Sequence, residues 1–219
     1  MAAAQRYIYL SRLAQAISFN FILFSLVIQI YFCRGYEEIF DALLARGAEV
    51  LCKTDTGITT LILASSGGFA NISRKCIAAG VDVNSRIESH GGTALMAAAH
   101  RGNTEIVSML IRAGAHIDAV NKDGWCALLA AVDGGRKAVV KLLLTSGANV
   151  NTTSTAGWTA LMSAASNGYP KITDLLISYN AHLEARQEDG WTPLLMAATE
   201  GHKDVVTILI LRGADVKVW

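Results

Sequence analysis

Residues 189–215 read DGWTPLLMAATEGHKDVVTILILRGAD, and a similar stretch, AGWTALMSAASNGYPKITDLLISYNAH, begins 33 residues earlier at Ala156. Three glycine positions recur at this interval, one opening each phrase, one in its middle and one closing it. They are Gly57, Gly91, Gly124, Gly157 and Gly190; Gly35, Gly68, Gly102, Gly135, Gly168 and Gly201; and Gly47, Gly80, Gly114, Gly147 and Gly213. A fixed interval of this length indicates a repeat architecture in which similar units stack on one another.

Each unit is expected to contain two short antiparallel helices, because its apolar residues have helical spacing on both sides of the middle glycine. The first helix is rich in alanine and the second carries bulkier side chains, so the units should be wedge-shaped and form a curved stack. Pro170 falls in the first turn of a second helix, where its missing amide hydrogen is not needed. Asn180 replaces the closing glycine in one unit and is expected to adopt a left-handed conformation. The polar segments between units, such as residues 147–157, predict projecting hairpins, here called fingers.

The repeated phrase resembles the ankyrin repeat, whose consensus is close to DxxGxTPLHxAAxxGHxxVVxLLLxxGAdvN. This resemblance implies an all-α solenoid of stacked helix-turn-helix units with projecting β-hairpin-like fingers. Fingers and first helices would line a concave groove that binds proteins. The matching units are 54–87, 88–120, 121–153, 154–186 and 187–219, with a degenerate unit at 21–53 whose second half, 36–53, is recognisable.

The unit 54–87 departs most from its neighbours. Ser73 and Lys75 occupy the places that Val107 and Met109 hold in the next unit, and the following finger contains an extra residue. Because the stability of a repeat array is roughly a sum of unit and interface contributions, this unit is expected to be the least stable.

Composition narrows the classes of function. Hydrophobic residues make up 52% and charged residues 17%, with a formal net charge of +1 and no basic stripe, so nucleic-acid binding is not expected. The four cysteines form no CxxC pair and the five histidines lack metal-ligand spacing, so we expect neither a metal nor another cofactor. No nucleophile or phosphate-loop motif indicates an enzyme. The expected function is therefore a non-catalytic protein–protein interaction module or scaffold.

Three tryptophans, Trp125, Trp158 and Trp191, directly follow the opening glycine of successive units. In a stacked array they would form a row along the concave face, and tryptophan is strongly enriched at binding hot spots. The alternative is that each ring lies against the next finger and only braces the stack. The sequence leaves both interpretations open.

Further candidate partner-binding residues lie at variable positions of the ankyrin pattern. At the ends of first helices they are His100, Arg101, Asp133, Ser166, Asn167, Thr199 and Glu200; at finger tips they are Lys122, Asp123, Arg186, Glu188 and Asp189. Taken singly, each also fits an ordinary solvated side chain. Together with the tryptophans they would make an amphipathic groove suited to a basic or aromatic peptide, because a cation is attracted to the face of an indole ring.

Asn84 and Asn151 match the finger asparagine that is hydroxylated in some proteins of this family, and this resemblance implies the same modification here. The alternative is that both side chains simply bond within their own turns.

The N-terminal segment 1–35 does not follow the repeat. Residues 13–33 carry no charge and are long enough to cross a bilayer, but several polar side chains weaken a membrane span. We favour an irregular first helix that covers the end of the stack, and a cytoplasmic or nuclear protein. A membrane-anchored ankyrin protein, or a piece of a larger channel or enzyme in which the array docks partners, is the alternative. Trp219 falls at a unit boundary, so either the last helices tolerate exposure or the chain is a fragment.

Overall fold

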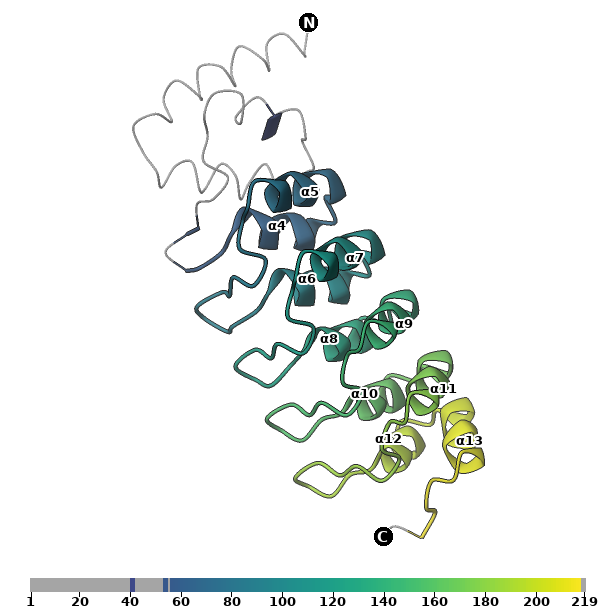
Figure 1. Ribbon diagram of the computed structural model, residues 1–219. Helices are drawn as coiled ribbons and strands as arrows, with labels where there is room; N and C mark the ends of the chain where they lie inside the picture. Colours follow the sequence, from purple (N-terminus) through teal and green to yellow (C-terminus); the bar gives the residue numbers. More distant parts are fainter. Residues whose placement is uncertain (1–39, 42–52, 55, 218–219) are drawn as a thin grey trace, which may run out of the picture.

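The computed structural model describes residues 40–41, 53–54 and 56–217 (Figure 1). Every named element within these residues is a helix. The helices within these residues are α4 (Thr60–Gly67), α5 (Ala70–Ala78), α6 (Ala94–Arg101), α7 (Thr104–Arg112), α8 (Ala127–Asp133), α9 (Lys137–Thr145), α10 (Ala160–Ser166), α11 (Pro170–Ser178), α12 (Pro193–Thr199) and α13 (Lys203–Leu211). In the described part of the chain, β structure is limited to two isolated antiparallel bridges, Lys53 with Thr59 and Thr153 with Thr159.

The helices form two rows that run the length of the stack. The first helices α4, α6, α8, α10 and α12 pack on one another, and the second helices α5, α7, α9, α11 and α13 form a parallel row beside them. Figure 1 shows the fingers projecting on the side of the first helices and the second helices on the other side. This arrangement confirms the all-α repeat solenoid that the 33-residue interval predicts.

The core repeats with the sequence. Alanines at one position of every first helix have no exposed surface: Ala64, Ala98, Ala131, Ala164 and Ala197. Their small side chains let neighbouring first helices approach closely. The corresponding core position of the second helices is fully buried leucine in four units, Leu110, Leu143, Leu176 and Leu209. In α5 this position is held by the smaller, also fully buried Cys76.

Threonine side chains begin most first helices. The hydroxyl oxygens of Thr59, Thr93, Thr159 and Thr192 each accept a hydrogen bond from the backbone N–H three residues later, at 3.2–3.3 Å. Such N-caps satisfy donors that the first turn of a helix leaves free. In α8 the corresponding residue is Cys126, which makes no side-chain cap.

The ends of helices and units follow the expected local rules. Pro170 is the first residue of α11, as its missing N–H requires. Asn180 adopts a positive φ of 64°, which confirms that it replaces the closing glycine in a left-handed conformation. The closing turn therefore keeps its left-handed residue in a unit that lacks the glycine.

The unit 54–87 contains two buried hydroxyls without a hydrogen-bond partner, those of Ser65 and Ser73. Both residues are fully buried, and the next unit has Ala99 and Val107 at these positions. A buried polar group that makes no hydrogen bond costs free energy. This gives a structural basis to the expectation that the unit is the least stable, which stays a prediction.

The expectations for residues 1–35, and for most of the degenerate unit 21–53, lie outside the described residues. Within the part that the structure describes, no helix has both the length and the apolar character to cross a membrane. The segment 13–33, to which the membrane alternative refers, is outside that search.

Candidate functional site

The tryptophan backbones are fixed at the base of the fingers. In one finger Asn121 N–H donates to the carbonyl of Trp125 at 2.9 Å, and Trp125 N–H donates to Asn121 Oδ1 at 2.8 Å. In the next finger Ser154 and Trp158 exchange the same pair of bonds through backbone and hydroxyl, at 2.9 and 3.1 Å. The side chains of Trp125 and Trp158 are therefore both attached to a backbone that hydrogen bonds hold in a closed hairpin.

Neighbouring fingers are linked through their backbones. Lys122 N–H donates to the carbonyl of His90 and Thr155 N–H donates to that of Asp123, both at 2.9 Å. Close approach requires glycine at this point: a Cβ on Gly124 would lie 2.6 Å from the nitrogen of Thr155. The fingers at His90, Asp123 and Thr155 thus form a connected row rather than independent loops.

The three tryptophans are neither fully buried nor fully free. Trp125 and Trp158 are half-buried, and Trp125 packs against the hydrophobic core. Trp191 is 38% exposed. Trp125 therefore contributes to packing, whereas Trp191 presents part of its surface to solvent. Partner binding by any of the three rings stays a prediction.

The charged residues at the finger tips differ in whether they already have hydrogen-bond partners within the protein. Lys122 Nζ donates to the carbonyl of Glu88 at 2.7 Å, and the Asp123 carbonyl accepts from both the N–H and the hydroxyl of Thr155. Three charged residues at the tip of the last finger are exposed and make no side-chain hydrogen bond or ion pair within residues 56–217. They are Arg186, Glu188 and Asp189.

The candidate residues at helix ends form a second row. His100, Arg101, Asp133, Ser166 and Thr199 are in the last turns of first helices, and Asn167 and Glu200 cap such helices. A seven-residue helix is about 10 Å long, so this row is separated from the tryptophans by the length of the first helices. The structure therefore divides the candidates into a finger row and a helix-end row.

Within the helix-end row, one pair spans two units. Nε2 of His100 lies 3.6 Å from Oδ2 of Asp133, and both side chains are about half exposed, at 53% and 43%. An ion pair in this position depends on protonation of the histidine and is screened by solvent.

The residue after the middle glycine reaches back to the preceding unit, a role that the sequence analysis missed. Asn103 Nδ2 donates to the carbonyl of Ser65 at 3.1 Å, and Arg136 Nε donates to that of His100 at 3.0 Å. His202 Nε2 lies 2.9 Å from the Ser166 carbonyl oxygen. These contacts engage carbonyls that the end of a first helix leaves unpaired. The signal in the sequence is a polar residue at this position in three units.

Asn84 and Asn151 join neighbouring units, so the interpretation that they bond only within their own turns is wrong. Asn151 Nδ2 donates to the carbonyl of Asn180 at 3.2 Å, and its Oδ1 accepts from the N–H of His182 at 2.9 Å. Asn84 makes the equivalent bonds to the next unit, at 3.1 and 2.8 Å. Hydroxylation of either side chain stays a prediction.

The same register continues through Asp118 and Glu184, which accept from the backbone N–H groups of Asn149 and Asp215 at 2.9 and 2.8 Å. An oxygen acceptor at this position thus meets a backbone donor at four successive interfaces. The sequence analysis identified Asn84 and Asn151, but as candidates for hydroxylation and not as contacts between units. The recurrence of Asn, Asp, Asn and Glu in one register was the available signal.

Two of the titratable groups buried in the described part of the stack are thiols, those of Cys76 and Cys126. Burial raises the pKa of Cys76 to about 12, and burial also raises the pKa of Cys126. Both thiols are therefore protonated near neutral pH and act as small core side chains. Over the described ranges, no group of three or more His, Cys, Asp or Glu side chains is arranged to hold a metal ion.

Comparison with known proteins agrees with the geometry of the stack. A family model described as ankyrin repeats (3 copies) matches residues 27–121, 75–154 and 128–218. These overlapping matches extend over most of the chain.

Curated relatives contain similar stretches. Ankyrin repeat and KH domain-containing protein 1 of Homo sapiens is 41% identical over 92 residues, which is 42% of this chain and 4% of that protein. Ankyrin repeat domain-containing protein 17 of Homo sapiens is 42% identical over 78 residues, 35% of this chain and 3% of that protein. The protein mask of Drosophila melanogaster, also described as containing ankyrin repeats and a KH domain, is 37% identical over 92 residues, 42% of this chain and 2% of that protein. The chain thus spans only a small part of the length of these relatives.

Proposed function

Because this chain belongs to the ankyrin repeat family, whose repeats are generally protein–protein interaction modules, we propose that it is a non-catalytic scaffold that binds a protein partner. The proposed binding surface is the finger side of the stack, formed by the finger row and the helix-end row. Its partner would be a peptide or loop rich in basic or aromatic residues.

The exposed ring of Trp191 is the observation that carries this proposal. A tryptophan that is 38% exposed offers a large rigid surface that a partner can bury. The neighbouring carboxylates of Glu188 and Asp189 are exposed and have no ion pair within residues 56–217. A lysine or arginine of the partner would gain both from these charges and from the face of the indole.

The experiment compares proteins captured from cell lysate by the full chain and by its Trp191→Ala variant, with mass spectrometry as the readout. We choose Trp191 first because Trp125 and Trp158 are more buried and Trp125 packs against the hydrophobic core, so that their replacement is more apt to disturb folding. The Trp191→Ala variant should keep its helical circular dichroism and lose specific proteins. A second variant, Glu188→Gln with Asp189→Asn, should weaken capture of the same proteins.

The matched control is Leu211→Ala, which removes a side chain that is 79% exposed on the second-helix side. Loss of the same proteins from this control and from Trp191→Ala would point to general loss of apolar surface. Retention of every protein by Trp191→Ala would contradict the proposed surface.

A further inference from the structure

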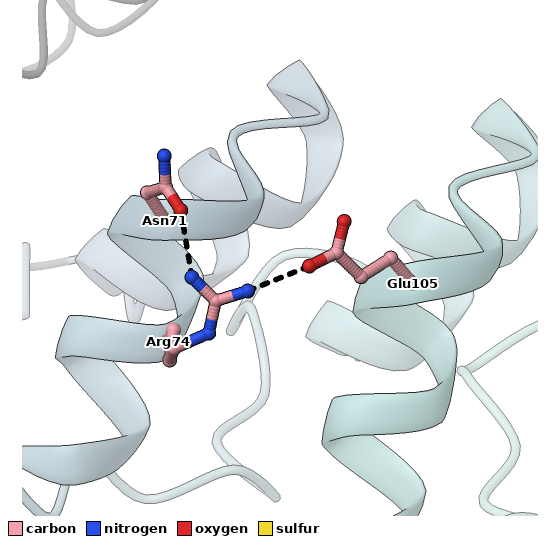
Figure 2. A network of polar contacts seen from close by, with 3 residues as sticks. All are labelled: Asn71, Arg74 and Glu105. Atoms are coloured by element: carbon pink, nitrogen blue, oxygen red, sulfur yellow. Dashed lines mark hydrogen bonds and ion pairs between the residues drawn. The ribbon is translucent and has the colours of Figure 1, made fainter.

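On the side of the stack away from the fingers, side chains of each second helix meet side chains of the next second helix. Figure 2 shows one such contact between α5 and α7, where Arg74 donates to Asn71 Oδ1 and to Glu105 Oε1, both at 2.6 Å. Arg74 and Glu105 therefore mark two positions that meet across neighbouring second helices. In this contact the two positions carry opposite charges.

At the contact between α9 and α11, the two facing positions both carry lysine. Lys141 corresponds to Arg74 and Lys171 corresponds to Glu105, counted by the repeat interval. Lys137 precedes Lys141 by one helical turn and lies on the same face of α9. We call Lys137, Lys141 and Lys171 the lysine patch. All three side chains are exposed, and none makes a hydrogen bond or ion pair with another described residue.

The carboxylates around the patch do not neutralise it. Asp174 is the only acidic residue of α9 and α11, and Arg212 Nη2 already holds its Oδ1 at 2.5 Å. On the next helix towards the N-terminus, Glu105 is held by Arg74. The remaining charged neighbours are Arg112 at the end of α7 and the adjacent Lys203 and Asp204 at the start of α13.

Stacking of the units does not require lysine at both facing positions of α9 and α11. The contact between α5 and α7 holds the same two positions together with a pair of opposite charges, whereas facing like charges repel. Two facing lysines, with a third on the same face, instead form a small surface on which carboxylates can pair with ammonium groups.

We propose that the lysine patch is a second docking surface, which binds an acidic segment of a protein partner. The limited size of the patch favours a protein over a nucleic acid, because phosphate binding along a strand needs a longer basic stripe. Asp204, at the start of the next helix α13, would also repel such a strand. The patch lies on the second helices, away from the finger side, so it extends the proposed scaffold by a second, oppositely charged site (Figure 1).

The test measures fluorescence anisotropy of a dye-labelled oligo-glutamate peptide titrated with the full chain at low salt. The wild-type chain should bind it, and Lys171→Glu should weaken binding by roughly tenfold because an attraction becomes a repulsion. The same variant should keep or raise the melting temperature, since the new carboxylate faces Lys141 as Glu105 faces Arg74. Added salt should weaken binding by the wild type.

The control is Lys217→Glu, which changes net charge equally at an exposed lysine that lies after the end of α13 and on none of the second helices. Equal weakening by this control, or no binding by the wild type, would overturn the proposal. Tighter binding of a single-stranded oligonucleotide of equal charge would overturn the assignment to a protein segment. If Lys171→Glu does not fold, Lys141→Met removes the charge without reversing it and should also weaken binding. These variants leave the finger side intact, so the outcome is independent of the capture experiment with Trp191→Ala.

Discussion

Ser73 carries a hydroxyl that the stack buries but does not pair. The equivalent residues Val107 and Val140 are fully buried and apolar, so the site is suited to valine. We predict that Ser73→Val raises the free energy of unfolding by about 1–2 kcal/mol, because it removes an unsatisfied polar group and adds buried apolar surface. Urea unfolding of the full chain, followed by circular dichroism, measures the change.

Thr173 is the control for this prediction, since it occupies the same register in α11 and is also fully buried. Its hydroxyl, however, donates to the carbonyl of Tyr169 at 3.0 Å. Thr173→Val should therefore bring no comparable gain. Equal gains at both sites would mean that burying a methyl group in place of a hydroxyl, rather than the unpaired state of the Ser73 hydroxyl, sets the stability. Ser73→Ala tests the same hydroxyl without adding volume.

At the scale of the helix, the beginning of α8 differs from its equivalents. Cys126 has the extended backbone of an N-cap, with φ of −106° and ψ of 177°, and makes no cap hydrogen bond. At the same position Thr93 and Thr159 are buried and cap their helices. We predict that Cys126→Thr stabilises the chain by about 0.5–2 kcal/mol through the missing cap. Denaturant unfolding under reducing conditions measures it.

Cys76→Ser provides the opposite case, because Cys76 is buried within α5, where a hydroxyl cannot act as an N-cap. This variant should lose stability, as one more polar group enters an apolar site. The interpretation would be refuted by a gain in both variants, which would indicate an effect of thiol removal alone.

The sequence predicted helices better than the contacts between them. Regular spacing of apolar residues and glycines was sufficient for α10 and α11, and for the left-handed Asn180, because these depend on local preferences. The reach of Arg136 to the preceding unit depends on the distance between stacked units, which no local preference determines. For the candidate site, the sequence predicted Trp191 in a row along the concave face, but its exposed fraction depends on packing against neighbouring residues.

At the scale of the whole molecule, the contacts between units are nearly interchangeable. The side chains of Asp118 and Asn151 accept from backbone N–H groups, and the fingers at Asp123 and Thr155 are linked backbone to backbone. Because a backbone donor is present whatever the residue, one unit can stack on a unit that is not its natural neighbour. The fully buried alanines of successive first helices give these contacts the same spacing.

Deletion of residues 121–153, one full unit, should therefore give a folded and shorter stack. Asp118 would then accept from the N–H of His182, in place of that of Asn149, and the finger of residues 88–90 would meet the finger at Thr155. Unfolding in urea should stay cooperative, with an m-value lower by roughly a fifth, since this slope follows the surface exposed on unfolding. A matched deletion of residues 121–150 removes three residues fewer and shifts the following helices out of register. It should lose helical signal or stability far beyond the first deletion, and equal behaviour of the two would contradict a stack built from interchangeable units.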